Sequence, residues 1–142
     1  MLERQFTLIN LLSEIPRLAE TIEAFGEQGA LTPNEIYPLN LVMEELLVNT
    51  ISYGYNDPLQ HTIEISLRID DDYLTAVVID DGIAFNPLED APTPVLAGEV
   101  EDRPIGGLGI HFMRTLMDEI QYQRDGDKNR LTMIKYRKAE SR

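Results

Sequence analysis

The sequence predicts an α+β fold, a two-layer sandwich in which helices cover one face of a mixed, mainly antiparallel sheet. The first observation is the order of the predicted segments: a strand, two helices, two strands, an irregular stretch, a helix and two strands. The second is that neighbouring strands are joined by short turns instead of crossover helices, which disfavours a doubly wound parallel sheet. The third is the length of 142 residues, which predicts a single domain over residues 1–142 with a core of its own.

The N-terminal part predicts a strand followed by a helix. Residues 2–9 alternate loosely between apolar and polar, as an edge strand does. From about Asn10, apolar residues recur at helical spacing, and we expect Gly26 and Gly29 to end this helix.

A longer helix is expected next. The run Thr32-Pro33-Asn34-Glu35 has the residues of a capping box, with proline at the first helical position. The helix should continue to about Tyr53, where Gly54 follows. Its main buried stripe is expected to contain Ile36, Leu39, Met43, Leu46, Thr50 and Tyr53.

The rest of the chain predicts two hairpins separated by an irregular stretch. Residues 63–69 and 74–79 form the first hairpin, and strands near 119–124 and 130–137 form the second. Between them, residues 86–105 hold four prolines and five acidic residues without periodicity, so this stretch is either disordered or a functional lid. A helix rich in leucine and methionine is expected after the lid, with its methionines in the core.

Composition excludes several classes of function. Twelve basic against 25 acidic residues give a net charge of -13, which would repel nucleic acid and anionic membranes. The chain has no cysteine, so it has neither a disulfide nor a thiol nucleophile. No apolar run approaches the roughly 18 residues of a membrane span, and no signal peptide is recognised. We therefore expect a soluble, cytoplasmic protein.

Glu45 and Asn49 are the first candidate site residues. They lie four residues apart, hence on one side of the long helix. Such a pair is often a solvated face. Apolar neighbours favour the alternative, in which a carboxylate in a half-dry pocket accepts a proton and an amide oxygen binds Mg²⁺. Glu44 competes with Glu45, but it points nearly a third of a turn away.

Two glycine-containing motifs are the other candidates. Asp80-Asp81-Gly82 ends a strand and is either a turn or a purine site, in which Asp80 accepts a hydrogen bond from the exocyclic amine. There, Gly82 would let the base approach the backbone. Gly106-Gly107-Leu108-Gly109 opens a helix and is either a flexible entry or an anion site for phosphates. It matches neither a Walker A loop nor a Rossmann fingerprint.

The order of these motifs resembles the GHKL (Bergerat) ATP-binding fold, which has a helix with E-x-x-x-N, a strand ending in D-x-G and a G-x-G that opens a helix. The amino-acid sequence in and around these motifs is similar to that of the bacterial anti-sigma factor serine kinases, over essentially the whole chain. The segments that carry this resemblance are MEELLVNTISYGYND, VVIDDGIAFNP, GGLGIHFMRTLMDEIQY and NRLTMIKY.

The resemblance implies roles for individual residues. Glu45 would be the general base and Asn49 the Mg²⁺ ligand. Asp80 would bind the adenine amine, Gly82 would flank the base, and Thr132 would sit behind Asp80 on the floor of the pocket.

The phosphate contacts implied by the resemblance lie in the glycine-rich motif, where Gly107, Leu108 and Gly109 would hold the nucleotide. Arg103 stands near the place of a phosphate-facing arginine, although its offset from the glycines differs. Ala84 replaces the second glycine of D-x-G-x-G, which would tighten the adenine pocket. No role is expected for the two histidines, His61 and His111.

The resemblance implies an ATP- and Mg²⁺-dependent serine kinase that phosphorylates an anti-anti-sigma (STAS-type) protein and sequesters a sigma factor. It also implies a homodimer. A nucleotide-gated binding module without phosphotransfer is the alternative, favoured by Ala84 and the acidic, proline-rich lid. A scaffold that binds no nucleotide is a third possibility.

Overall fold

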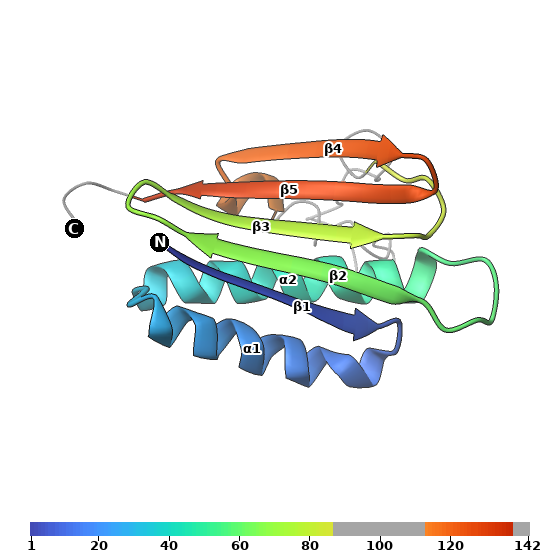
Figure 1. Ribbon diagram of the computed structural model, residues 1–142, viewed down its shortest axis with the longest axis horizontal. Coiled ribbons are helices and arrows are strands. Elements are labelled where there is room, and N and C mark those ends of the chain that lie inside the picture. The colour runs from blue at the N-terminus through green and yellow to red at the C-terminus, as the bar shows by residue number, and fades with distance from the viewer. Residues whose placement is uncertain (87–112, 138–142) are drawn as a thin grey trace, which may run out of the picture.

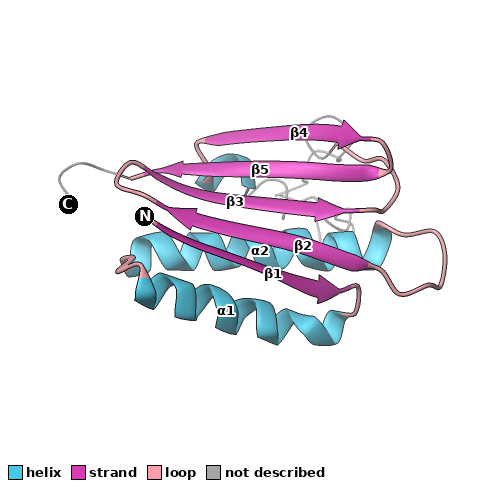
Figure 2. Ribbon diagram, viewed as in Figure 1, coloured by secondary structure: helices cyan, strands magenta, loops and turns pink. Residues whose placement is uncertain are grey.

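The structure, a computed structural model, describes residues 1–86 and 113–137, which fold into a sheet with helices packed on one of its faces (Figures 1 and 2). This arrangement confirms the predicted two-layer α+β fold. The strands are β1 (Leu2–Ile9), β2 (Thr62–Ile69), β3 (Tyr73–Asp80), β4 (Glu119–Asp125) and β5 (Lys128–Tyr136), and the helices are α1 (Ile15–Gln28) and α2 (Pro33–Tyr53).

The sheet has five strands in the order β1-β2-β3-β5-β4. Each of the four neighbouring pairs is antiparallel, so the sheet formed by the described strands has no parallel pair. Both predicted hairpins, β2–β3 and β4–β5, are confirmed, and β1 is the predicted edge strand. The central pair, β3 with β5, joins the two halves of the chain.

Helix α1 differs from its prediction at both ends. It begins at Ile15, after a short 3-10 turn, and not near Asn10 as expected. It also continues through Gly26 and ends before Gly29. Gly26 is buried where an added Cβ would lie 2.7 Å from the Ile36 side chain, so its role is to let α1 pack closely on α2.

Helix α2 begins as predicted. The Thr32 N–H donates to Glu35 Oε1 at 3.0 Å, which is the reciprocal contact of a capping box. The prediction for Tyr53 is wrong, because this side chain is 53% exposed. Tyr53 is the last residue of the helix, and the chain turns away at Gly54 beyond the buried part of the helix.

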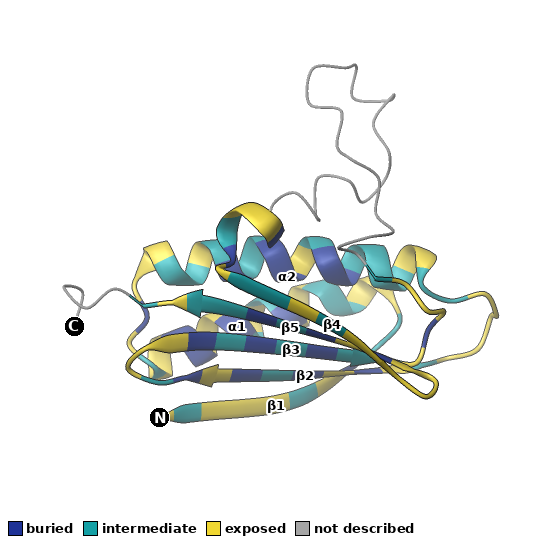
Figure 3. Ribbon diagram, turned by 90° about the horizontal axis from the view of Figure 1, so that it is seen from above, coloured by how far each residue is buried: buried dark blue, intermediate teal, exposed yellow. Residues whose placement is uncertain are grey.

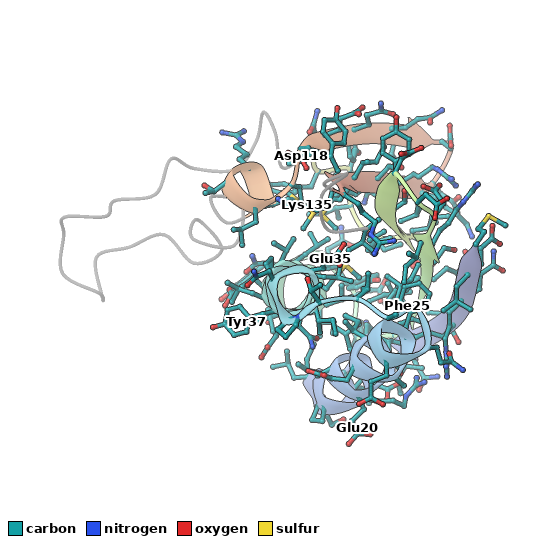
Figure 4. All side chains as sticks on the ribbon, turned by 90° about the vertical axis from the view of Figure 1, so that its left-hand side faces the viewer. Glu20, Phe25, Glu35, Tyr37, Asp118 and Lys135 are labelled. Atoms are coloured by element: carbon teal, nitrogen blue, oxygen red, sulfur yellow. The ribbon has the colours of Figure 1, made fainter. Side chains whose placement is uncertain are left out.

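The core lies between α1, α2 and one face of the sheet (Figure 3). Figure 4 shows Phe25 of α1 directed into this layer, whereas Glu20 and Tyr37 point outward. Met113 and Met117, in the helical segment before β4, are buried there, which confirms that the methionine pair belongs to the core. Neither helix in the described part of the chain is long and apolar enough to cross a membrane.

Candidate functional site

Asp80 ends β3 on the side of the sheet that faces the helices. Along β3, Leu74, Ala76 and Val78 are buried in the core, and the alternation of a strand puts Asp80 on the same face. Asp80 is half-buried, and its Oδ1 accepts two hydrogen bonds, from the Gly82 N–H and from Asn129 Nδ2, both at 2.9 Å. The carboxylate is therefore held in one orientation.

Gly82 brings the loop after β3 against the end of α2. An added Cβ would lie 2.3 Å from the Gly54 carbonyl oxygen, a distance that no side chain tolerates. The next residue, Ile83, donates its N–H to that same oxygen at 2.8 Å. In the structure this glycine makes room for the backbone of Gly54, and the role expected from the sequence, that it lets a base approach, stays a prediction.

Asn129 is the residue that sequence reasoning missed. It is 8% exposed and is the buried polar residue of the described chain. Its amide donates to Asp80 and to the Ile83 carbonyl at 2.8 Å, and its Oδ1 accepts from Tyr122 at 2.5 Å and from Arg124 at 3.2 Å. A polar residue at a core-facing position of an alternating strand was the available signal.

Thr132 does not lie next to Asp80, so that prediction is wrong. In the register of β3 and β5, Asp80 faces Asn129 and Val77 faces Thr132. Asn129 and Leu131 point into the core, and alternation turns Thr132 to the open face of the sheet. Asn129 holds the place beside Asp80, because a strand position of the other parity belongs to the opposite face.

Glu45 and Asn49 lie one turn apart on α2, and both are half-buried, while Glu44 is exposed. Leu46 and Leu47 beside them are buried against the core. Both residues therefore lie where the buried face of the helix meets its exposed face. The helix ends against the loop that follows Asp80, because the Gly54 carbonyl accepts the hydrogen bond from Ile83.

The predicted phosphate-binding residues Arg103, Gly107, Leu108 and Gly109 lie outside the described residues, as does nearly all of the predicted lid. Ala84, two residues before the predicted lid, is exposed.

His61, for which no role was expected from the sequence, links the connection between α2 and β2 to the loop after β3. Its Nδ1 lies 3.0 Å from Asp81 Oδ1, and its Nε2 lies 2.8 Å from Asp57 Oδ1. The hydrogen bond with Asp57, followed by the one with Asp81, raises the pKa of the His61 ring. The ring also stacks on Tyr55, with 4.4 Å between the centroids.

Tyr55 completes this cluster. Its hydroxyl is buried and has no hydrogen-bond partner in the described part of the chain. Burial, and then the charges of Asp80 and Asp81, raise the pKa of the phenol, so the hydroxyl stays protonated at neutral pH. A buried donor whose pKa is influenced by Asp80 thus has no partner among the described residues.

The described side chains provide no ready-made metal cage. No group of three or more histidine, aspartate or glutamate residues among them is placed to hold an ion. Glu45 and Asn49, one turn apart on α2, carry oxygen atoms, the type of ligand that Mg²⁺ takes. A shallow groove on the open face, lined by residues such as Glu64, Arg68 and Arg130, lies on the other side of the sheet from Asp80.

The sequence is similar to those of known proteins. Residues 10–135 match the family described as "Histidine kinase-like ATPase domain". The chain is 30% identical over 120 residues to an anti-sigma F factor of Clostridium novyi, covering 84% of this chain and 82% of that protein. It is 26% identical to the serine-protein kinase RsbW of Bacillus velezensis, covering 84% and 76%.

Solved structures show the same fold. The histidine kinase domain of the blue-light activated kinase of Erythrobacter litoralis superposes with a TM-score of 0.55 at 17% identity, covering 87% of this chain and 59% of that one. The histidine kinase AdeS of Acinetobacter baumannii superposes with a TM-score of 0.52 at 17% identity, covering 94% and 68%.

Proposed function

Since the chain belongs to the histidine kinase-like ATPase family, we propose that it is an ATP-dependent protein serine kinase that acts as an anti-sigma regulatory factor. The observation that carries the proposal is Asp80, fixed at the end of β3 beside the end of α2, within a sequence that matches this family over residues 10–135. The similarity to an anti-sigma F factor supports the anti-sigma role, and the similarity to the serine-protein kinase RsbW supports a protein serine as the phosphate acceptor.

The adenine ring is proposed to bind at Asp80. Asp80 Oδ1 is already occupied by the Gly82 N–H and by Asn129, so the other carboxylate oxygen is the one that accepts from the exocyclic amine. Asn129 also holds the Ile83 carbonyl, so the loop after Asp80 is fixed before the ligand arrives. Such preorganisation reduces the ordering cost of binding.

Phosphate transfer is proposed to use the side of α2 that carries Glu45 and Asn49. The serine oxygen of the acceptor protein attacks the γ-phosphorus, the bond to the β,γ-bridging oxygen breaks, and ADP leaves. The Glu45 carboxylate accepts the serine proton as this happens. Asn49 would help to hold Mg²⁺, which supplies charge neutralisation at the phosphates. Arg103, Gly107, Leu108 and Gly109 are proposed to contact those phosphates.

The proposed partners are a sigma factor, which the protein sequesters, and a STAS-type anti-anti-sigma protein, which it phosphorylates. Because sigma factors act in the cytoplasm, we place this activity there. We also propose a homodimer, which sedimentation velocity at several concentrations tests directly. A single monomeric species at every concentration would contradict the dimer.

The decisive experiment compares Glu45→Ala with Glu44→Ala, using radiolabelled ATP, Mg²⁺ and a STAS-type acceptor from the same genome. Glu45→Ala should keep ATP affinity within a few fold while phosphate transfer falls roughly 10²- to 10⁴-fold, the usual contribution of a positioned base. Glu44→Ala is the matched control, because Glu44 is the exposed neighbour of Glu45 and should retain transfer.

Two results would contradict this mechanism. An unchanged rate in Glu45→Ala would remove Glu45 as the base. ATP binding without transfer from the wild-type chain to any STAS-type acceptor would favour the alternative function, a nucleotide-gated binding module.

A further inference from the structure

Besides Asn129, which binds the Ile83 carbonyl and the Phe85 N–H, three further contacts from described residues hold the loop that follows Asp80, and one of these three can titrate near neutral pH. The Ile83 N–H binds the Gly54 carbonyl, and Arg124 Nη1 donates to the Gly82 carbonyl at 2.9 Å. The third contact is that of Asp81, whose carboxylate is bound by His61. Histidine is the side chain that changes charge between pH 5 and 8.

We call the two contacts of the His61 ring, with Asp57 and with Asp81, the clamp. Because both partners are carboxylates, His61 must be a cation for both contacts to form. Both ring nitrogens face carboxylate oxygens, Asp81 at Nδ1 and Asp57 at Nε2, at hydrogen-bonding distance. An ionised carboxylate only accepts hydrogen bonds, and a neutral imidazole has one donor. The neutral ring therefore binds one carboxylate and faces the other without a proton, whereas the imidazolium ring binds both.

His61 itself is fixed in place. Its N–H donates to Asn10 Oδ1 at 2.8 Å, and its carbonyl accepts from the Asn10 N–H at 3.0 Å. Its ring stacks on Tyr55, and its side chain is 15% exposed. Within residues 1–86 and 113–137, the charged and titratable groups that face this ring are Asp57 and Tyr55, from the connection between α2 and β2, and Asp81, from the loop after β3.

The clamp bears directly on Asp80. Asp81 is its neighbour in the chain. The Tyr55 ring, which stacks on His61, carries a hydroxyl that has no partner among the described residues, and its pKa is raised by burial and then by the charge of Asp80. When His61 loses its proton, three carboxylates, Asp57, Asp80 and Asp81, share this corner without a cation between two of them. Repulsion between the carboxylates then loosens the loop, and the loss of one positive charge makes the site more negative for an incoming nucleotide.

We propose that His61 is a positioning residue of the nucleotide site and that its protonation strengthens ATP binding by clamping Asp81 to Asp57. This inference rests on the proposed function, because it concerns the affinity for ATP. The raised pKa of the His61 ring agrees with the geometry. The sign follows: the clamp is complete below this pKa, and ATP binding weakens as the pH rises through it.

The test measures the dissociation constant of ATP by isothermal titration from about pH 5.5 to 8.5 at saturating Mg²⁺. We expect the wild-type affinity to fall about fivefold over this range, a typical coupling between two sites. The glutamine in His61→Gln is neutral over the whole range, so this variant should bind ATP at every pH with the weaker affinity that the wild type has at high pH. Protonation of the nucleotide itself affects the affinity of every variant in the same way, so it drops out when variants are compared.

His111→Gln is the matched control, because the chain has two histidines, and it should keep the pH dependence. Asp81→Asn is a second variant. It removes one carboxylate from beside the His61 ring, so the change in ATP affinity should occur at lower pH. An independent readout is the pKa of His61 from the NMR titration of its ring, which by linkage must rise when ATP is bound.

The outcomes separate the two proposals. ATP binding whose pH dependence survives His61→Gln, or a His61 pKa that ATP leaves unchanged, would overturn the role of His61 alone. Absence of ATP binding to the wild-type chain at every pH would overturn the proposed function and this role with it.

Discussion

At the scale of single residues, the site depends on one amide. Asn129 donates to Asp80 and Ile83 and accepts from Tyr122 and Arg124, so it joins β3, β4, β5 and the loop after β3. Its removal takes a hydrogen bond from several partners at once. These partners are half-buried or exposed, so water replaces part of what is lost, and the net cost is about 1–3 kcal/mol in all. The orientation of Asp80 therefore depends on a residue on a neighbouring strand.

Asn129→Ala should lower the free energy of unfolding by about 1–3 kcal/mol and weaken ATP binding, because Asp80 and the Ile83 carbonyl each lose a donor. Urea denaturation and isothermal titration measure the two effects. Thr132→Ala is the control on the same strand, since its side chain lies on the open face, and it should leave ATP affinity unchanged. A larger loss of affinity in Thr132→Ala than in Asn129→Ala would restore the sequence-based prediction for Thr132.

The sequence predicted the place of Asp80 at the end of an apolar strand but not what surrounds it. Asp80 ends an apolar strand, which is a local signal, whereas its partner Asn129 is 49 residues away along the chain. Gly82 was recognised as a place of close approach, but the approaching group, the Gly54 carbonyl, depends on how α2 meets the sheet. His61 has its partners on two separate connections, and no local pattern brings them together.

At the scale of elements, one ion pair fastens the start of α2 to the sheet. Arg137, which follows β5, donates to Glu35 Oε2 at 2.7 Å and to the Asp70 carbonyl in the β2–β3 turn at 2.9 Å. Both charged side chains are about five-sixths buried, with 16% and 15% exposed. Figure 4 shows Glu35 directed toward the end of the sheet where Asp118 and Lys135 also lie.

Glu35→Gln should destabilise the protein by about 1–3 kcal/mol at pH 7, because a hydrogen bond between charged groups is lost within a partly buried site. Burial alone would raise the pKa of Glu35, but hydrogen bonds from Arg137 and Thr32 outweigh it and hold the pKa below its usual range. The stabilisation is therefore present above the unfolded-state pKa and is lost as the pH falls through the lower folded-state value. Urea denaturation from pH 7 to pH 3 should show the variant and the wild type converging at acid pH; a constant difference would contradict this role.

Elements were predicted best where local signals and packing agree. The capping residues Thr32 and Glu35 marked the start of α2, and the alternating strands fixed both hairpins. The boundaries of α1 were predicted less well, because Gly26 was interpreted as a helix end while tertiary packing against Ile36 keeps it helical.

At the scale of the whole molecule, a net charge of -13 opposes the binding of a polyphosphate. The candidate site contributes to this field, since Asp57, Asp80 and Asp81 lie together beside it. A divalent cation that accompanies the nucleotide reduces this repulsion, so the proposed function requires binding to depend strongly on Mg²⁺.

Mg²⁺ and ATP together should raise the melting temperature by roughly 5–10 °C at a nucleotide concentration near one hundred times the dissociation constant. This range follows from about 2.7 kcal/mol of ligand stabilisation in a domain of this size. Differential scanning calorimetry with ATP and Mg²⁺, with ATP and EDTA, and with Mg²⁺ alone measures the dependence. An equal shift with EDTA would show that Mg²⁺ contributes nothing to binding.

The pairing of β3 with β5 makes the sheet tolerant of change in the chain between its two halves. Residues 81–118 connect β3 to β4, yet the strands on either side remain held by their own hairpins. Closing a loop becomes costlier only with the logarithm of its length, about 0.6 kcal/mol for each doubling. Insertions and deletions between the loop after Asp80 and the core residue Met113 should thus leave the sheet and its helices folded, so this part of the chain can change in evolution without a change of fold.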